Sequence, residues 1–157
     1  MTSWNASTGA VLHDPLVSAG GPLGASVSGS KLYLSVGDGT IGIYDADTGA
    51  AVNSSLVAGG DLRYPIVNGG DLLVARFSSN TIARYDAATG SLLDASFITG
   101  LSGPEAIAIS GSDLFVANYN NGTIGRYNAT TGALINASFI SGLSGPAQIA
   151  LSGSNLF

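Results

Sequence analysis

The chain has 157 residues, of which 45% are hydrophobic and 10% are charged, and its formal net charge at pH 7 is −5. This length suffices for one domain with a buried core, but five basic residues without a basic stripe argue against a nucleic-acid partner. No apolar run is long enough for a transmembrane helix, and the absence of cysteine excludes disulfides, thiolate catalysis and cysteine-based metal sites.

A six-residue phrase occurs four times along the chain. It consists of an aromatic residue, Asn or Asp, Ala, a variable residue, Thr and Gly, and it begins at Trp4, Tyr44, Tyr85 and Tyr127. Its glycines recur at intervals of 40, 41 and 42 residues. A period of this size, built from short apolar runs and turn residues, is typical of repeated four-stranded β-units, the blades of a β-propeller.

Each unit is expected to contain four strands, A to D, which are clearest in the third complete copy. Residues 106–109 alternate as strand A, a Ser-Gly turn follows, and residues 113–117 form strand B. Residues 123–127 form strand C, the repeated phrase makes the next turn, and residues 134–136 form a short strand D before an apolar pair. The chain then divides into a half-blade (1–18), three blades (19–60, 61–101 and 102–143) and a second half-blade (144–157).

The two half-blades are complementary. Trp4 takes the slot of the strand C tyrosines, whereas Leu156 and Phe157 match Leu114 and Phe115 of strand B. We expect closure or assembly through Trp4, Leu151, Leu156 and Phe157. The alternatives are a four-bladed ring closed by its own ends, a head-to-tail dimer with eight blades, a polymer, or an excerpt of a longer repeat protein.

No catalytic or metal-binding set emerges from the sequence. His13 is the single histidine and falls in the outermost strand of the first half-blade, where we expect a solvated side chain. Asp38, Asp45 and Asp47 are close together but lack the pattern of a calcium loop. We therefore expect no catalytic residues, no metal and no cofactor.

Variable positions cluster where strand A begins and strand B ends, two places that share one face of a propeller. Equivalent slots hold Leu23, Arg63, Glu105 and Ala147, and in the next position Gly24, Tyr64, Ala106 and Gln148. A glycan, peptide or small molecule could bind here, with arginines for carboxylates and aromatic rings for apolar faces. The candidate residues are Arg63, Tyr64, Arg76, Phe77, Glu105, Asn118 and Tyr119.

The units resemble the NHL and YVTN-type propeller repeats and those of the virginiamycin B lyase propellers. The resemblance rests on G-P-x-x-I-A-x-S-G-S-x-L-F-V-A-N, ending at Asn118, and on G-T-I-x-R-Y, ending at Tyr127. The lyase activity would require a histidine base and acidic metal ligands on one face, which this chain does not supply. We expect a non-enzymatic structural or interaction module, and the composition favours an exported bacterial surface protein.

Overall fold

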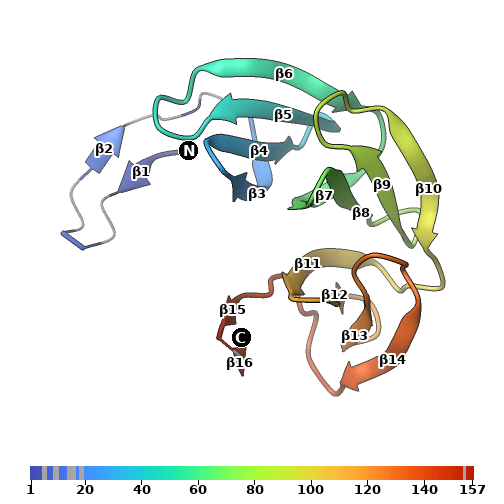
Figure 1. Cartoon of the computed structure of the whole chain (residues 1–157). Helices are drawn as coiled ribbons and strands as arrows, with labels where there is room; N and C mark the ends of the chain where they lie inside the picture. Colours follow the sequence, from blue (N-terminus) through green and yellow to red (C-terminus); the bar gives the residue numbers. More distant parts are fainter. Residues whose placement is uncertain (5–6, 9–10, 14–16, 18–19, 154) are drawn as a thin grey trace.

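The computed structural model describes residues 1–4, 7–8, 11–13, 17, 20–153 and 155–157. These residues form only strands, turns and irregular segments, which confirms the all-β prediction. Three four-stranded antiparallel sheets follow one another around an arc, and a two-stranded hairpin lies at each end (Figure 1). The strands are β1 (Ser3–Trp4), β2 (Val11–His13), β3 (Pro22–Ser28), β4 (Lys31–Val36), β5 (Thr40–Asp45), β6 (Ala51–Ala58), β7 (Leu62–Asn68), β8 (Asp71–Arg76), β9 (Thr81–Asp86), β10 (Leu92–Ile98), β11 (Pro104–Ser110), β12 (Asp113–Asn118), β13 (Thr123–Asn128), β14 (Leu134–Ile140), β15 (Leu151–Ser152) and β16 (Asn155–Leu156).

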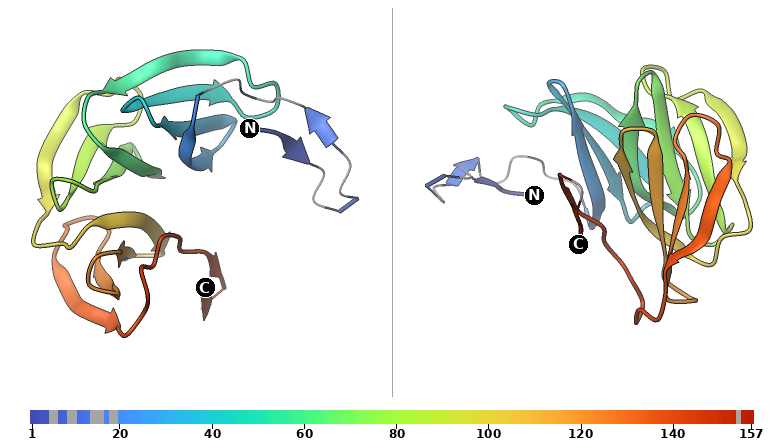
Figure 2. Two further views of the ribbon diagram at one scale, coloured as in Figure 1. Left: turned by 180° about the vertical axis from the view of Figure 1, so that it is seen from behind. Right: turned by 60° about the horizontal axis from the view of Figure 1, so that its bottom comes forward.

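Each complete sheet is a simple meander in which sequence neighbours pair. The first blade has the order β3-β4-β5-β6, the second β7 to β10 and the third β11 to β14. The innermost strands β3, β7 and β11 lie toward the centre of the arc, and β6, β10 and β14 lie outside (Figure 2). The outer strand is longer than the sequence predicted, because it runs through a register shift to include the apolar pair at its end.

The hydrophobic core lies between blades and not within them. Since a sheet has two faces, alternate residues of one strand contact different neighbours: Leu72 faces the first blade, whereas Leu73 faces the third. One cluster joins the first and second blades, and another joins the second and third. A third cluster on the first blade holds Leu32, Leu34 and Val36 with Val17 from the N-terminal segment. Folding of one blade therefore depends on its neighbours.

The repeated phrase forms the turn between strands C and D through side-chain hydrogen bonds. Oδ1 of Asp86 accepts from the backbone N–H groups of Ala88 and Thr89 at 3.0 and 2.8 Å, and from the Thr89 hydroxyl at 2.9 Å. Asp45 and Asn128 make the same three contacts in the other complete blades. The phrase is thus a structural turn, as its chemistry predicts.

These turns should make stability sensitive to acid. Hydrogen bonds from Thr48 and Thr89 lower the pKa values of Asp45 and Asp86. Because the folded pKa is the lower one, this stabilisation is present above the unfolded value of about 3.9 and is lost as pH falls through the folded pKa. We expect the melting temperature to fall less between pH 6 and pH 2 in the double variant Asp45→Asn/Asp86→Asn than in the parent chain. An unchanged acid slope, measured by circular dichroism, would contradict this assignment.

The end hairpins have the registers of the half-blades that the sequence predicts. In β1–β2, Trp4 pairs with Val11, as Tyr127 pairs with Leu134 in the third blade. In β15–β16, Leu151 pairs with Leu156, as Ile109 does with Leu114. The two hairpins form separate sheets and do not pair with each other among the described residues.

Candidate functional site

The residues predicted to share one binding face lie in different surroundings. Arg63, Phe77, Glu105 and Tyr119 gather where the second and third blades meet. Tyr64 lines a cavity near the centre of the arc. Arg76 and Asn118 belong to neither group.

Arg63 is occupied by carboxylates of the chain itself. Its Nε donates to Oδ1 of Asp61 at 2.7 Å, and one terminal nitrogen donates to Oε1 of Glu105 on the next blade at 3.2 Å. Burial would raise the pKa of Asp61, but hydrogen bonds from Arg63 and Ser78 outweigh it and lower that pKa. Burial raises the pKa of Glu105 against the opposing charge of Arg63. Arg63 thus joins two blades and is not a free anchor for a ligand carboxylate.

Phe77 and Tyr119 complete this cluster with aromatic contacts. The Arg63 guanidinium lies 5.4 Å from the Phe77 ring centroid, and Phe77 meets Tyr119 edge to face at 6.2 Å. Tyr119 remains 46% exposed and is the part of the cluster most open to a partner. The cluster can contact an apolar or aromatic group, while its charges are already paired.

Replacing Arg63 tests whether this cluster stabilises the contact between the second and third blades. Arg63→Met should cost about 1 to 2 kcal/mol of unfolding free energy, because it leaves Asp61 and Glu105 as partly buried carboxylates without their cation. Arg84→Met is the matched control, since Arg84 lies 3.7 Å from Asp71 in a more exposed pair and should cost less than about 0.5 kcal/mol. Equal losses in urea denaturation would contradict the role given to Arg63.

Asn118 and Arg76 have other surroundings. Asn118 is buried, accepts from the backbone N–H of Ser102 at 3.1 Å and donates to the Thr123 hydroxyl at 3.3 Å, so it fixes the loops of the third blade. Arg76 is partly buried on β8, and its Nε has no hydrogen-bond partner among the described residues. It lies beside Gly60, at the junction with the first blade.

Tyr64 occupies a strained position that points inward. Its φ of 31° is in the left-handed region, which non-glycine residues rarely adopt. Its ring lies against Gly24 of the first blade, where a Cβ atom would fall 2.6 Å from the ring. Its hydroxyl accepts a hydrogen bond of 3.1 Å from Nε2 of Gln148. Tyr64 therefore connects the second blade with the first and with the C-terminal segment.

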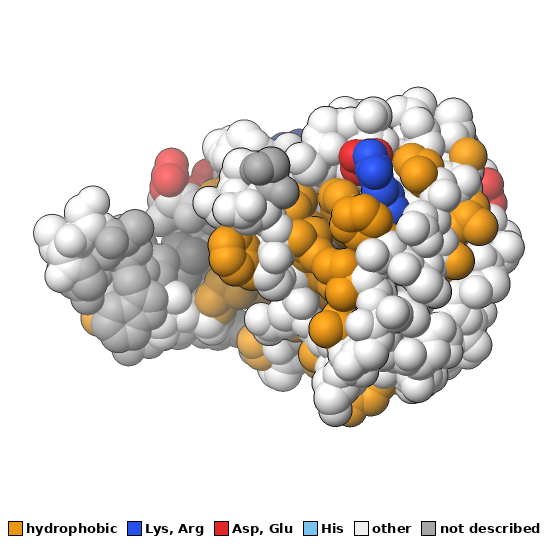
Figure 3. All heavy atoms as spheres, turned by 90° about the horizontal axis from the view of Figure 1, so that it is seen from below, with side chains coloured by type: hydrophobic (Ala, Val, Ile, Leu, Met, Phe, Trp, Pro, Cys, Tyr) orange, Lys and Arg blue, Asp and Glu red, His pale blue; other side chains and the backbone are white. Residues whose placement is uncertain are grey.

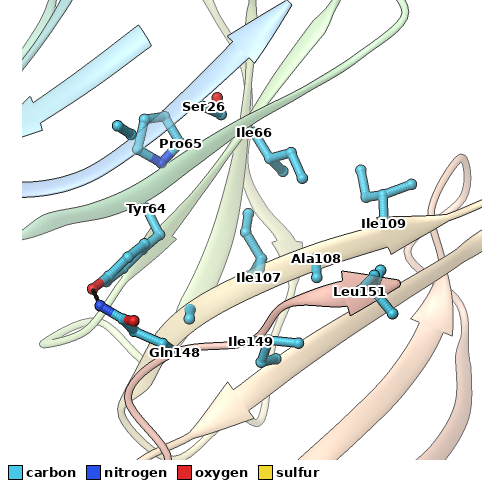
Figure 4. Close-up of a pocket in the computed structure, with 12 residues that line it drawn as sticks. Ser26, Tyr64, Pro65, Ile66, Ile107, Ala108, Ile109, Gln148, Ile149 and Leu151 are labelled. Carbon is cyan, nitrogen blue, oxygen red and sulfur yellow. Dashed lines mark hydrogen bonds between the residues drawn. The ribbon is translucent and has the colours of Figure 1, made fainter. Parts of the chain in front are cut away.

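The cavity near Tyr64 has a volume of about 390 Å³ and a mainly apolar lining. Its walls come from β3, β7 and β11 together with the segment that leads into β15 (Figure 4). Figure 4 shows the Tyr64 hydroxyl and Gln148 joined at one end and isoleucines along the walls. The sequence comparison placed Tyr64 and Gln148 in one slot but did not predict that they meet.

The remaining candidates lie at the ends of the chain. Leu151 lines the central cavity, Leu156 is partly exposed, and Phe157 is 71% exposed. Trp4 and His13 lie in β1 and β2, and their side chains are outside the described residues. Within the described part of the chain, no group of three acidic, histidine or cysteine residues could hold a metal. No helix there is long and apolar enough to cross a membrane.

No protein-family model and no curated protein sequence matches this chain. Solved structures do match. The computationally designed Ika4 protein superposes with a TM-score of 0.65 and 18% identity over 90% of this chain and 88% of its own. A functionally unknown protein from Desulfotomaculum acetoxidans gives a TM-score of 0.68 and 22% identity, over 86% of this chain and 47% of its own.

BamB from Moraxella catarrhalis extends the likeness. It has a TM-score of 0.57 and 20% identity, and the match covers 99% of this chain and 47% of BamB. This chain therefore spans about half the length of the last two proteins. At these identities the likeness concerns the fold alone, and the chain has the all-β architecture of propeller blades.

Proposed function

We propose that this chain is a non-enzymatic interaction module, a small propeller that closes into a ring by joining its C-terminal hairpin to its N-terminal hairpin. The observation that carries the proposal is the pair of complementary hairpins at the two ends of one arc. β15–β16 supplies strands A and B, and β1–β2 supplies strands C and D. Joined edge to edge, they make one composite blade and remove two unpaired strand edges.

The curvature of the arc favours closure within one chain. Gln148 precedes the C-terminal hairpin, and it reaches across to Tyr64 of the second blade at 3.1 Å. The cavity is bounded by three inner strands and by this segment, which occupies the fourth side. Such contacts across the axis fit a ring of four blades better than a wide ring of eight.

The outer face of the third blade supports the same proposal. Phe97 of the second blade is partly buried and packs on the cluster shared with the third blade, whereas Phe139, the equivalent residue of the third blade, is 43% exposed. Phe139 packs on Phe115 and under Arg126, and among the described residues only the two-stranded β15–β16 sheet follows the third blade. Figure 3 shows an exposed patch of apolar side chains on the side seen from below, next to a basic and an acidic side chain. A composite blade would cover this face.

Trp4 is a native reporter for closure because it is the single tryptophan of the chain. By register it corresponds to Tyr127, which packs between the second and third blades. In a composite blade Trp4 would face the third blade. We expect blue-shifted tryptophan emission that resists acrylamide quenching.

A matched pair of variants tests the cause of that protection. Leu156→Asp should release Trp4 and restore quenching toward that of a free tryptophan derivative, since Leu156 is its strand partner in the composite blade. Leu134→Asp, on an exposed position of β14, should leave the protection unchanged. Full quenching of Trp4 in the parent chain would overturn the proposal.

A further inference from the structure

We infer that the central cavity is a binding site for a small uncharged ligand with an apolar body and one hydrogen-bond acceptor, such as a ketone. The cavity volume of about 390 Å³ lies within the range of small-molecule sites. The inference does not depend on closure, because the lining residues come from the three blades and the C-terminal segment.

The chemistry of the walls selects the class of ligand. Ile66, Ile107, Ile109 and Ile149 give the cavity apolar walls, and none of its described lining residues carries a charge. A charged ligand would lose its hydration without finding a counter-ion there. An apolar ligand would instead cover surface that now faces water.

A hydrogen-bonding group lies at one end of the cavity. The Tyr64 hydroxyl accepts a hydrogen bond from Gln148, so its own proton is oriented for donation. Ser26 of the neighbouring strand β3 also lines the cavity, but its hydroxyl oxygen is buried from solvent, so the Tyr64 hydroxyl is the donor that a ligand can reach. One hydroxyl donor against an apolar surface suits a ligand with one acceptor oxygen.

The strain at Tyr64 adds an independent argument. A tyrosine at φ 31° is held in an unfavourable backbone conformation, and such positions cluster at binding sites. The equivalent positions of the first and third blades hold Gly24 and Ala106, and the missing Cβ of Gly24 leaves room for the ring. One large side chain is thus placed among small ones, with its hydroxyl at the edge of the cavity.

Fluorescence titration with prodan, an uncharged naphthalene that carries a ketone, tests the inference. We expect saturable binding of one prodan per chain with blue-shifted emission. Ala25→Trp, which fills the cavity from an exposed position of β3, should weaken binding at least about tenfold. Tyr64→Phe should weaken it about fivefold by removing one hydrogen bond.

Two controls separate this site from the other apolar surfaces. Tyr119→Phe changes a tyrosine outside the cavity and should leave prodan affinity unchanged. Phe157→Ser removes the most exposed of the large apolar side chains that the structure describes and should also have no effect. Absence of saturable binding would overturn the inference. So would binding that is insensitive to Ala25→Trp or lost in Phe157→Ser.

Discussion

Replacing Gly132 with alanine is expected to lower the free energy of unfolding by about 3 kcal/mol or more. Gly132 ends the turn between β13 and β14 with φ +71°, a conformation that costs an alanine about 1 to 2 kcal/mol. An added Cβ would also meet the carbonyl oxygen of Phe97. Because Phe97 belongs to the second blade, the turn glycine permits close approach of two blades as well as the turn itself.

Gly111 provides the matched control for this prediction. It lies in the turn between β11 and β12 with φ +59°, but a Cβ there would meet no atom within 4 Å. Gly111→Ala should therefore cost only the backbone strain, about 1 to 2 kcal/mol. Urea denaturation measures both variants. Equal losses would show that Gly132 serves the turn and not the packing of the blades.

Replacing Leu114 with alanine is expected to cost about 3 to 4 kcal/mol, because Leu114 is fully buried between the second and third blades. Leu134→Ala is the control, since Leu134 lies in the same blade but is 61% exposed on β14 and should cost less than about 0.5 kcal/mol. The Leu114 variant should still unfold in one transition, because each pair of neighbouring blades shares a core cluster. Two separate transitions in the parent chain would contradict this view of the core.

The blades could be predicted from the sequence because their strands and turns are determined by residues close together in the chain. The turn chemistry of Asp45, Asp86 and Asn128 sits at a fixed place in the repeat, and apolar alternation gives the strands between turns. The phase of the repeat also predicted a hairpin at each end. The length of the outer strand was wrong, because its register shift interrupts the alternation on which a strand is recognised.

The site was less predictable because it depends on how blades contact one another. Arg63 and Glu105 share one slot of consecutive units, 42 residues apart, and they form an ion pair. Tyr64 and Gln148 share the next slot, 84 residues apart, and they form a hydrogen bond. Residues at equivalent positions of successive repeats lie close together near the axis. The alignment of the repeats could therefore have predicted these contacts.

The ion pair between Asp61 and Arg63 could also have been predicted from the sequence. Asp61 lies immediately before β7, two residues ahead of Arg63, and in an extended backbone side chains two apart point to the same side. Arg63 was expected to bind a ligand carboxylate, whereas Asp61 and Glu105 occupy its donors. Variation at a slot therefore did not distinguish a binding residue from one that pairs with its neighbour.

An engineered disulfide between the two hairpins tests ring closure most directly, since the chain has no cysteine of its own. In the third blade Phe115 pairs with Arg126, and by the same register Phe157 would pair with Ser3 in the composite blade. Directly opposed residues of antiparallel strands lie about 4.5 to 5.5 Å apart between Cα atoms, which a disulfide can span. Thr2→Cys/Phe157→Cys is the control, because a shift of one residue turns the side chain to the other face.

The decisive quantity is the mass of oxidised Ser3→Cys/Phe157→Cys under non-reducing, denaturing conditions, together with its free thiol content. Closure within one chain predicts the single-chain mass of about 15.6 kDa with no free thiol. A two-chain mass would mean that the hairpins join between copies, and free thiols would mean that they do not join at all. Either result would contradict the closed four-bladed ring.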